Sequence, residues 1–214
     1  MTAKELKEIL QEILSEMLQS IFSENGFSYR KSSCSFMRII GDFKQIIKFY
    51  FTPIRYSDDQ SIGHLSIRIW LNSDVIEEKA STLINATAKI DKIDVVANID
   101  YGLITGKEAV IFFPQSVLDL RELFRFKIIP SMLNKVIPWL DAKTKMITLV
   151  EDYFKEEKYM DWSSSNEVAL RIIAICLLMN DIITAKKIAC KEFTKPNTGK
   201  KYKKILQVLE DNKQ

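Results

Sequence analysis

Apolar residues near the start of the chain are spaced three and four positions apart. This spacing places them on one side of an α-helix, so it predicts an amphipathic helix from about Lys4 to Ser23. Asn25 and Gly26 are expected to end this helix, because glycine adopts the left-handed backbone that is common at helix termini. The predicted apolar stripe consists of Leu6, Ile9, Leu10, Ile13, Leu14, Met17, Leu18 and Ile21.

After Gly26 the period changes to two, which is the period of a β-strand with one buried face. Residues 36–40 and 47–52 show this alternation, and Gly41 and Asp42 between them are expected to form the turn of a β-hairpin. A third antiparallel strand is predicted in residues 62–71. Its apolar side would carry Leu65, Ile67, Ile69 and Leu71, and its other side His64, Ser66, Arg68 and Trp70.

Further elements follow from capping residues and from the alternation of polar and apolar positions. Ser73 and Asp74 are candidate caps for a helix through about Lys89. Residues 94–105 and 108–114 are then predicted to form two more strands, which gives a sheet of about five strands.

From Ser116 to its end, the chain is predicted to be helical. We expect a kink or break near Pro130 and Pro138, because proline cannot donate the backbone hydrogen bond of a helix interior. Asp141 is a candidate start for the next helix. Ser164 and Glu167 have the spacing of a capping box at the head of an αα-hairpin that spans 165–193, with a break at Asn180 and Asp181. A last helix closes the chain.

These elements predict an α+β fold with an N-terminal helix, an antiparallel sheet and a helical C-terminal part. We expect residues 1–114 to form the α+β body and residues 115–214 to pack on it as helices. The connection between them is short and unlike a linker, which favours one compact unit.

Composition and charge exclude several classes of protein. The chain of 214 residues is 47% hydrophobic and 28% charged, with 6 Gly and 5 Pro, so it is neither disordered nor collagen-like. Its net charge of +3 is too balanced to attract nucleic acid or a membrane globally. The first helix lacks the features of a signal peptide, and the longest apolar run, residues 172–179, is too short to cross a bilayer.

The three cysteines, Cys34, Cys176 and Cys190, are widely separated and lack the paired spacing of a zinc site. We interpret them as reduced thiols in a cytoplasmic protein. No phosphate-binding loop or hydrolase motif is present, and His64 is the sole histidine, which excludes a histidine-dependent triad. We therefore predict no catalytic residues, no cofactor and no metal. For Asp58 and Asp59 a cation site and a solvated loop both remain open.

One candidate partner-binding surface lies on the polar side of the hairpin and the third strand. Aromatic residues together with arginine are typical of protein contact surfaces. The alternative is that these residues form the floor on which the C-terminal helices pack. Arg30, Lys31 and Arg38 are candidates to extend the surface, whose predicted residues are Lys48, Tyr50, His64, Arg68 and Trp70.

A second candidate surface is a lysine-rich stretch at 186–204. Clustered lysines bind phosphates or an acidic partner through their charge, so a nucleic-acid role is one interpretation and a solvated helix face is the other. The predicted basic patch consists of Lys186, Lys187, Lys191, Lys200, Lys201, Lys203 and Lys204.

The first 75 residues resemble an uncharacterised family of small bacterial domains of unknown function. The resemblance rests on a helix that ends in a Gly-Phe step and on a following Phe-x-Arg strand, matched here by Gly26, Phe27, Arg30, Phe36 and Arg38. Some members of that family sit among immunity proteins of toxin systems, so the resemblance implies an immunity-type inhibitor.

Taken together, the sequence predicts a cytoplasmic, non-enzymatic protein that binds another protein. Two alternatives stay open. One is a nucleic-acid-associated protein that uses the lysine cluster. The other is a small-molecule enzyme with carboxylates in a cleft.

Overall fold

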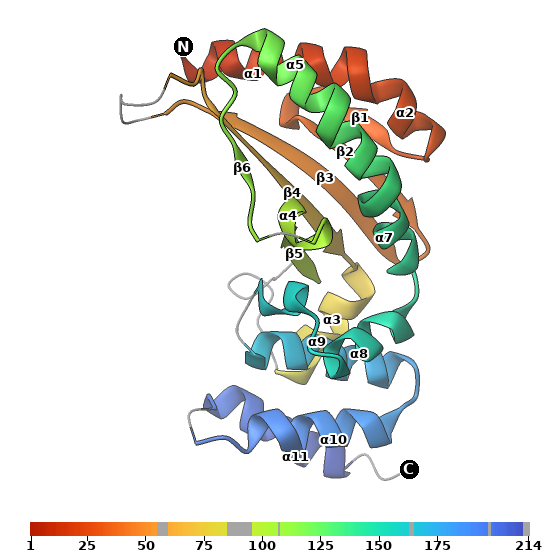
Figure 1. Ribbon diagram of the computed structural model, residues 1–214. Helices are drawn as coiled ribbons and strands as arrows, with labels where there is room; N and C mark the ends of the chain where they lie inside the picture. Colours follow the sequence, from red (N-terminus) through yellow and green to blue (C-terminus); the bar gives the residue numbers. More distant parts are fainter. Residues whose placement is uncertain (55–59, 85–95, 107, 163–164, 197, 212–214) are drawn as a thin grey trace. The chain divides into compact units, whose positions relative to one another are not determined.

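The structure is a computed structural model that describes residues 1–54, 60–84, 96–106, 108–162, 165–196 and 198–211 (Figure 1). The chain forms two compact units. The first comprises Met1–Ile40, Lys44–Trp70 and Asn98–Ala142, and the second comprises Gly41–Phe43, Leu71–Ala97 and Lys143–Gln214.

The first unit opens with one continuous helix made of α1 (Ala3–Ile13), a π-helical turn η1 (Leu14–Leu18) and α2 (Gln19–Glu24). Thr2 and Glu5 form a capping box at its start, in which each side chain accepts from the other residue's backbone N–H. Gly26 follows the helix with a φ of 78°, which confirms the expected glycine terminus.

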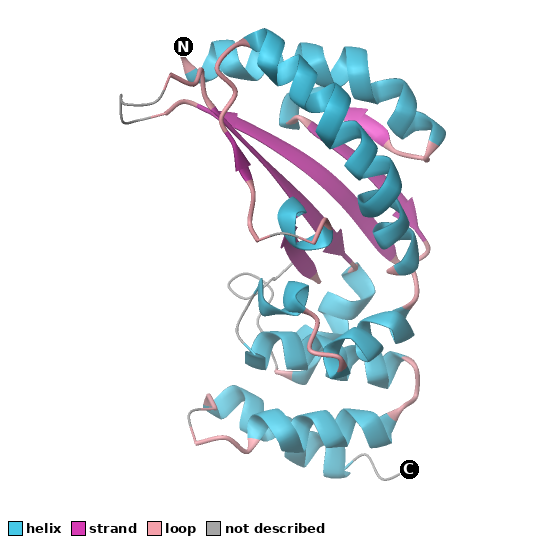
Figure 2. Ribbon diagram, viewed as in Figure 1, coloured by secondary structure: helices cyan, strands magenta, loops and turns pink. Residues whose placement is uncertain are grey.

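A six-stranded sheet follows, in the order β1-β2-β3-β4-β5, with β6 also paired to β4. Its strands are drawn in magenta in Figure 2. The predicted α+β fold and its antiparallel sheet are confirmed. The hairpin and the third strand lie where the alternation predicts them, whereas β1 has no counterpart in the prediction. The strands are β1 (Ser28–Arg30), β2 (Ser35–Ile40), β3 (Phe43–Thr52), β4 (His64–Asn72), β5 (Ala97–Asp100) and β6 (Ile111–Phe112).

The strand predicted over residues 94–105 is shorter than expected. Residues 94 and 95 lie outside the described residues, and β5 ends at Asp100, where the short helix α4 (Tyr101–Ile104) begins. Asp100 caps this helix, because its Oδ1 accepts from the N–H of Gly102 at 2.8 Å. Gly102 is required here, since a Cβ at this position would lie 2.1 Å from the carbonyl oxygen of Glu108.

A second long helix of the first unit runs through residues 117–142 without a break. Pro130 and Pro138 lie inside it, each shortly after a π-helical turn. Ile129 N–H donates to Phe124 O and Ile137 N–H donates to Met132 O, so the wider i to i+5 pattern carries the helix to each proline. The expected break is therefore wrong, whereas the expected kink stays a prediction. The parts are α5 (Val117–Leu123), η3 (Phe124–Ile128), α6 (Ile129–Ser131), η4 (Met132–Val136) and α7 (Ile137–Ala142).

Both long helices lie over the same face of the sheet and form one core with it (Figure 1). Arg121 of α5 ties the two helices together, since its guanidinium donates to Glu12 at 2.7 Å and to Glu16 at 2.6 Å. Among the largest fully buried side chains of this core are Phe22, Phe36, Phe49, Phe124, Leu14 and Ile47.

The second unit is built mainly from helices. Ser73 caps α3 as predicted. Residues 85–95 and 163–164, which include the expected end of this helix and Ser164 of the expected capping box, lie outside the described residues. The helix expected to start at Asp141 starts later, at Met146, and Asp141 belongs to α7. The helices are α3 (Asp74–Leu83), α8 (Met146–Phe154), η5 (Lys158–Trp162), α9 (Ser165–Leu178), α10 (Ile182–Phe193) and α11 (Lys200–Asp211).

The break expected at Asn180 and Asp181 is confirmed. Asn180 has a φ of 60°, and Asp181 caps α10 by accepting from the N–H of Thr184 at 3.0 Å. The division into units differs from the boundary expected at residue 114: the helix at 117–142 belongs to the first unit, because its apolar stripe packs on the sheet, and α3 belongs to the second. The expectation that the whole chain forms one compact unit stays a prediction.

Candidate functional site

The five residues of the predicted contact surface share the outer face of the sheet, the face opposite the two long helices of the first unit. Lys48 and Tyr50 on β3 alternate with buried core residues, as do His64, Arg68 and Trp70 on β4. Because α5–α7 pack on the other face, they do not use these side chains as a floor. We call these five residues the sheet-face cluster.

Lys48 holds the aromatic part of the sheet-face cluster together. Its Nζ lies 4.8 Å from the ring centroid of Tyr50 and 5.8 Å from that of Trp70. An ammonium group at this distance is attracted to the electron-rich faces of both rings. The interaction joins two neighbouring strands and limits the freedom of both aromatic side chains, which lowers the entropy that they would lose on binding.

Arg68 is the most exposed member of the sheet-face cluster, with 45% of its side chain accessible. Its Nε lies 3.9 Å from Oδ2 of Asp100. The other oxygen of Asp100 accepts from the N–H groups of Gly102 and Val110, at 2.8 and 3.0 Å. Asp100 is therefore fixed by the backbone, and it orients a guanidinium that still faces solvent.

His64 lies at the start of β4. Its Nε2 is 2.5 Å from the hydroxyl oxygen of Thr52, and its ring centroid is 6.4 Å from that of Phe113. Phe113 is 51% exposed, so the ring pair extends the aromatic surface to the chain segment after β6. Trp70 Nε1 is shielded from solvent and has no hydrogen-bond partner among the described residues.

Two of the three suggested extensions of this surface are exposed, namely Arg30 and Lys31, but the third is wrong. Arg38 lies on the core side of β2, with its guanidinium 4.4 Å from the ring centroid of Phe27. Its Nε donates to Oε1 of Gln45 at 2.7 Å, and its Nη2 pairs with Asp141.

Sequence reasoning missed this buried polar group. Gln45 donates onward to the carbonyl oxygen of Leu140 at 2.7 Å, so the group joins the hairpin to the end of α7. The sequence does contain a pattern that indicates it. Gln45 interrupts an otherwise apolar row on β3, and a two-residue turn places Gln45 opposite Arg38.

The residues of the predicted basic patch lie on α10 and α11 in the second unit, and acidic residues partly compensate them. Lys191 Nζ is 3.8 Å from Glu156 and 3.9 Å from Glu192. Lys187 and Lys191 also lie over the rings of Phe154 and Tyr153, at 5.3 and 5.5 Å. Lys200, Lys203 and Lys204 are exposed, Lys186 is half-buried, and the side chain of Lys201 lies outside the described residues.

A groove of about 400 Å³ opens beside this patch. Its most buried charge is Glu192, which accepts from the hydroxyl of Tyr153 at 3.0 Å and pairs with Lys195. Burial, together with the hydrogen bond to Glu192, raises the pKa of Tyr153. The carboxylate is thus held by two donors, an arrangement that stabilises helix packing.

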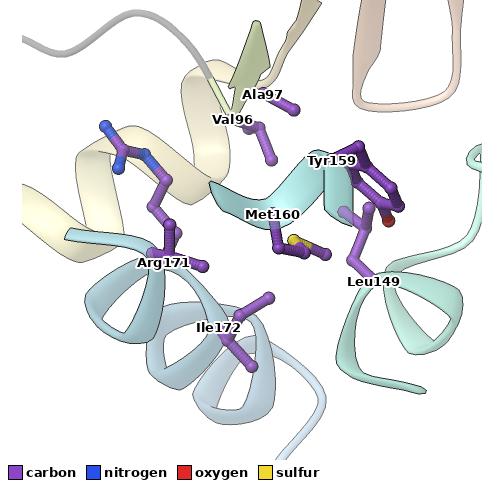
Figure 3. Close-up of a pocket in the computed structure, with 8 residues that line it drawn as sticks. Val96, Ala97, Leu149, Tyr159, Met160, Arg171 and Ile172 are labelled. Atoms are coloured by element: carbon purple, nitrogen blue, oxygen red, sulfur yellow. The ribbon is translucent and has the colours of Figure 1, made fainter. Parts of the chain in front are cut away.

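A small cavity of about 10 Å³ lies in the second unit between Val96 and Ala97, α8, η5 and α9 (Figure 3). Its lining is mainly apolar, and this volume is about the lower limit for one water molecule. Figure 3 shows the Arg171 side chain extending toward α3, where its Nε donates to Glu77 at 2.8 Å. A cavity of about 10 Å³ is too small for a substrate.

Asp152 forms another buried polar group beside this cavity. It accepts from both Lys143 and Tyr159. Burial is the main cause that raises the pKa of Tyr159, and the hydrogen bond to Asp152 adds to it. Within the described part of the chain, no three His, Cys, Asp or Glu side chains lie together in a group that could hold a metal ion. Asp58 and Asp59 lie outside that part.

Helices among the described residues are too short or too polar to span a membrane. Comparisons of the chain with protein-family models, with curated proteins and with solved structures find no match. The resemblance of the first 75 residues to a family with immunity-type members stays a prediction.

Proposed function

We propose that this protein is a non-enzymatic binding protein that captures a partner protein on the sheet-face cluster. The observation that carries the proposal is the place of Trp70, Tyr50 and Arg68 on the sheet face that α5–α7 leave uncovered. An anchored aromatic pair beside an exposed guanidinium is the combination that dominates binding energy in protein interfaces.

The charges on this face favour a partner with an acidic patch. Lys44, Lys48 and Arg68 occupy outward positions of β3 and β4, and the neighbouring Asp100 is already held by backbone N–H groups. Complementary charge would speed association and fix the orientation of the complex. An immunity-type inhibitor that acts in the cytoplasm on a toxin is one biological form of this function.

The alternatives have less support. Acidic neighbours compensate part of the lysine cluster, which reduces its attraction for a phosphate backbone. The carboxylate of Glu192 lies in a groove but is held by Tyr153 and Lys195, so it is poorly placed to act as a base.

A double variant tests the proposal against proteins encoded by the neighbouring genes, titrated one by one. Trp70→Ala combined with Arg68→Ala should weaken capture by at least about 30-fold, because losing such an anchor costs roughly 2 kcal/mol or more. The urea midpoint should stay nearly unchanged, since Arg68 is exposed and Trp70 lies outside the core.

A matched control replaces an exposed aromatic residue and an arginine on the helical side. Phe126 is 72% exposed and Arg125 is exposed, so Phe126→Ala combined with Arg125→Ala should keep full affinity. Equal loss in both double variants, or early unfolding of the Trp70 and Arg68 variant, would overturn the proposal. Salt-sensitive retention of the wild type by single-stranded RNA, lost on charge reversal of Lys200 and Lys203, would favour the nucleic-acid alternative.

A further inference from the structure

Strand β3 is longer than its neighbour β2, and this leaves part of one edge without a paired strand among the described residues. β3 has ten residues and β2 has six, and a two-residue turn at Gly41 and Asp42 fixes their register. The pairing extends as far as the N–H of Phe49, which donates to Cys34 O at 3.0 Å. Residues 50–52 of β3 therefore have no β2 residue opposite them.

The chain that could have continued the pairing turns away. Lys31–Ser33 form a 3-10 turn, and Cys34 follows in the left-handed region with a φ of 49°. The turn is fastened to α1, because Gln11 Nε2 donates to Lys31 O at 2.9 Å and Tyr29 donates to Gln11 O at 3.2 Å. These contacts hold the turn in place beside the free edge.

The result is a groove of about 330 Å³ between the edge of β3, the turn and the first part of α1. Strand hydrogen bonds alternate from side to side, so the N–H and C=O of Phe51 point the same way as those of Phe49, toward the groove. The charged residues among its described lining are two lysines, Lys7 and Lys48. Burial raises the pKa of the Cys34 thiol in this lining, and the two lysines partly offset that rise. Ser32, Ser33, Tyr50 and Thr52 add polar groups.

We propose that this edge groove binds a short, extended, acidic segment of a partner protein as an added strand on β3. The segment would exchange two backbone hydrogen bonds with Phe51. Its carboxylates at alternate positions, which share one face of a strand, would contact Lys7 on the helix side, and Lys48 would add positive charge from the other face. At about 3.3 Å per residue, the free length of β3 matches about three residues of such a segment. Strand addition uses main-chain hydrogen bonds for affinity and flanking side chains for specificity.

The backbone edge and the apolar lining favour a peptide over a small anion. Leu10, Phe49 and Phe51 line the groove together with the lysines, and they offer apolar contact that an inorganic anion cannot use. The edge groove shares Lys48 and Tyr50 with the sheet-face cluster. The two proposals can still be tested separately, because Lys7 and Ser33 lie outside the sheet-face cluster and Arg68 and Trp70 lie outside the groove lining.

The test uses the full chain, labelled with ¹⁵N, and a capped peptide of sequence TEVEVT at low salt. We expect chemical-shift changes in the amides of residues 31–34 and 49–52, and slower hydrogen exchange at the Phe51 amide. Lys7→Glu should weaken binding about tenfold, which corresponds to about 1.4 kcal/mol. Lys4→Glu is the matched control on the same helix, because Lys4 is paired with Glu8 outside the groove lining, and it should bind nearly as the wild type does.

Further peptides and the double variant separate the alternatives. The lysine peptide TKVKVT and a peptide that is N-methylated at its central residues should not bind, and the Phe126 and Arg125 double variant, whose residues lie outside the groove lining, should bind normally. The inference is overturned if no peptide shifts these amides, or if the N-methylated peptide or inorganic phosphate gives the same shifts. Concentration-dependent shifts at Phe51 without peptide would instead assign the edge to a second copy of this chain, which also overturns it.

Discussion

Arg38 is buried, although arginine side chains usually lie at the surface. It alternates with Met37 and Ile39 on a strand beside basic residues, so sequence alone places it equally well on either face. In the structure Gln45, the carbonyl oxygen of Asn25 and Asp141 surround its guanidinium. A buried arginine needs such partners, since an unpaired buried charge would be strongly destabilising.

The cysteines give a prediction at the same scale. Cys34 and Cys176 are buried, whereas Cys190 is exposed, and all three are free. Burial raises the pKa of the Cys34 thiol, and it is the main cause that raises that of Cys176 to about 11. Because the thiolate is the reactive form, Cys190 should react rapidly with a thiol reagent at neutral pH and the other two slowly.

The measurement is a thiol titration of the native protein and of the unfolded, unreduced protein. The native protein should show one fast thiol that Cys190→Ser removes, and the unfolded protein should show three, the full cysteine count. Recovery of a single thiol after unfolding would reveal a disulfide and would contradict the cytoplasmic interpretation.

At the scale of elements, the long helix at 117–142 shows that a proline does not by itself end a helix. The i to i+5 hydrogen bonds at Ile129 and Ile137 come directly before Pro130 and Pro138. This local widening, together with a buried apolar stripe along the helix, keeps the element intact.

The buried faces of helix and sheet support a second prediction. Leu14 and Ile67 are both fully buried, so Leu14→Ala and Ile67→Ala should each lower the free energy of unfolding by about 2 to 5 kcal/mol through lost contact and a residual cavity. Urea denaturation measures the loss. Leu118→Ala and Ile39→Ala are controls on exposed positions, 65% and 67% accessible, and each should cost less than about 0.5 kcal/mol. A loss of unfolding free energy below about 0.5 kcal/mol at Leu14 or Ile67 would show that the side chain faces away from the core.

At the scale of the whole molecule, buried and half-buried tyrosines in both units link stability to pH. Burial is the main cause that raises the pKa of Tyr29, to about 12, and of Tyr101 in the first unit, and of Tyr153 and Tyr159 in the second. In the unfolded chain these tyrosines lose their protons near pH 10, while the folded chain retains them. Their contribution is therefore fully present below about pH 10 and is lost as the pH rises through the folded pKa values.

We accordingly expect the free energy of unfolding to fall steeply above about pH 10, for both units. Urea denaturation across the alkaline range measures this, and Tyr159→Phe should make the decline shallower. Absorbance of the native protein at about pH 11 should show fewer tyrosinates than its seven tyrosines would give in the unfolded chain. A constant unfolding free energy across this range would contradict the prediction.

The sequence by itself determined the elements whose side-chain period is local. The spacing of three and four in the first helix, the alternation in β3 and β4, and the terminus at Gly26 follow from neighbours along the chain, so they could be predicted, as could the outward row of Lys48, Tyr50, Arg68 and Trp70.

Only the tertiary structure decided which layers cover which face and which charges are compensated. Asp141 pairs with Arg38 across 103 positions, and Glu77 pairs with Arg171 across 94, so no local pattern could indicate these partners. The free edge of β3 depends on how the 31–33 turn is fastened to α1. Periodicity shows that a face is apolar. Which element packs on that face depends on burial and on charge pairing between residues far apart in the chain.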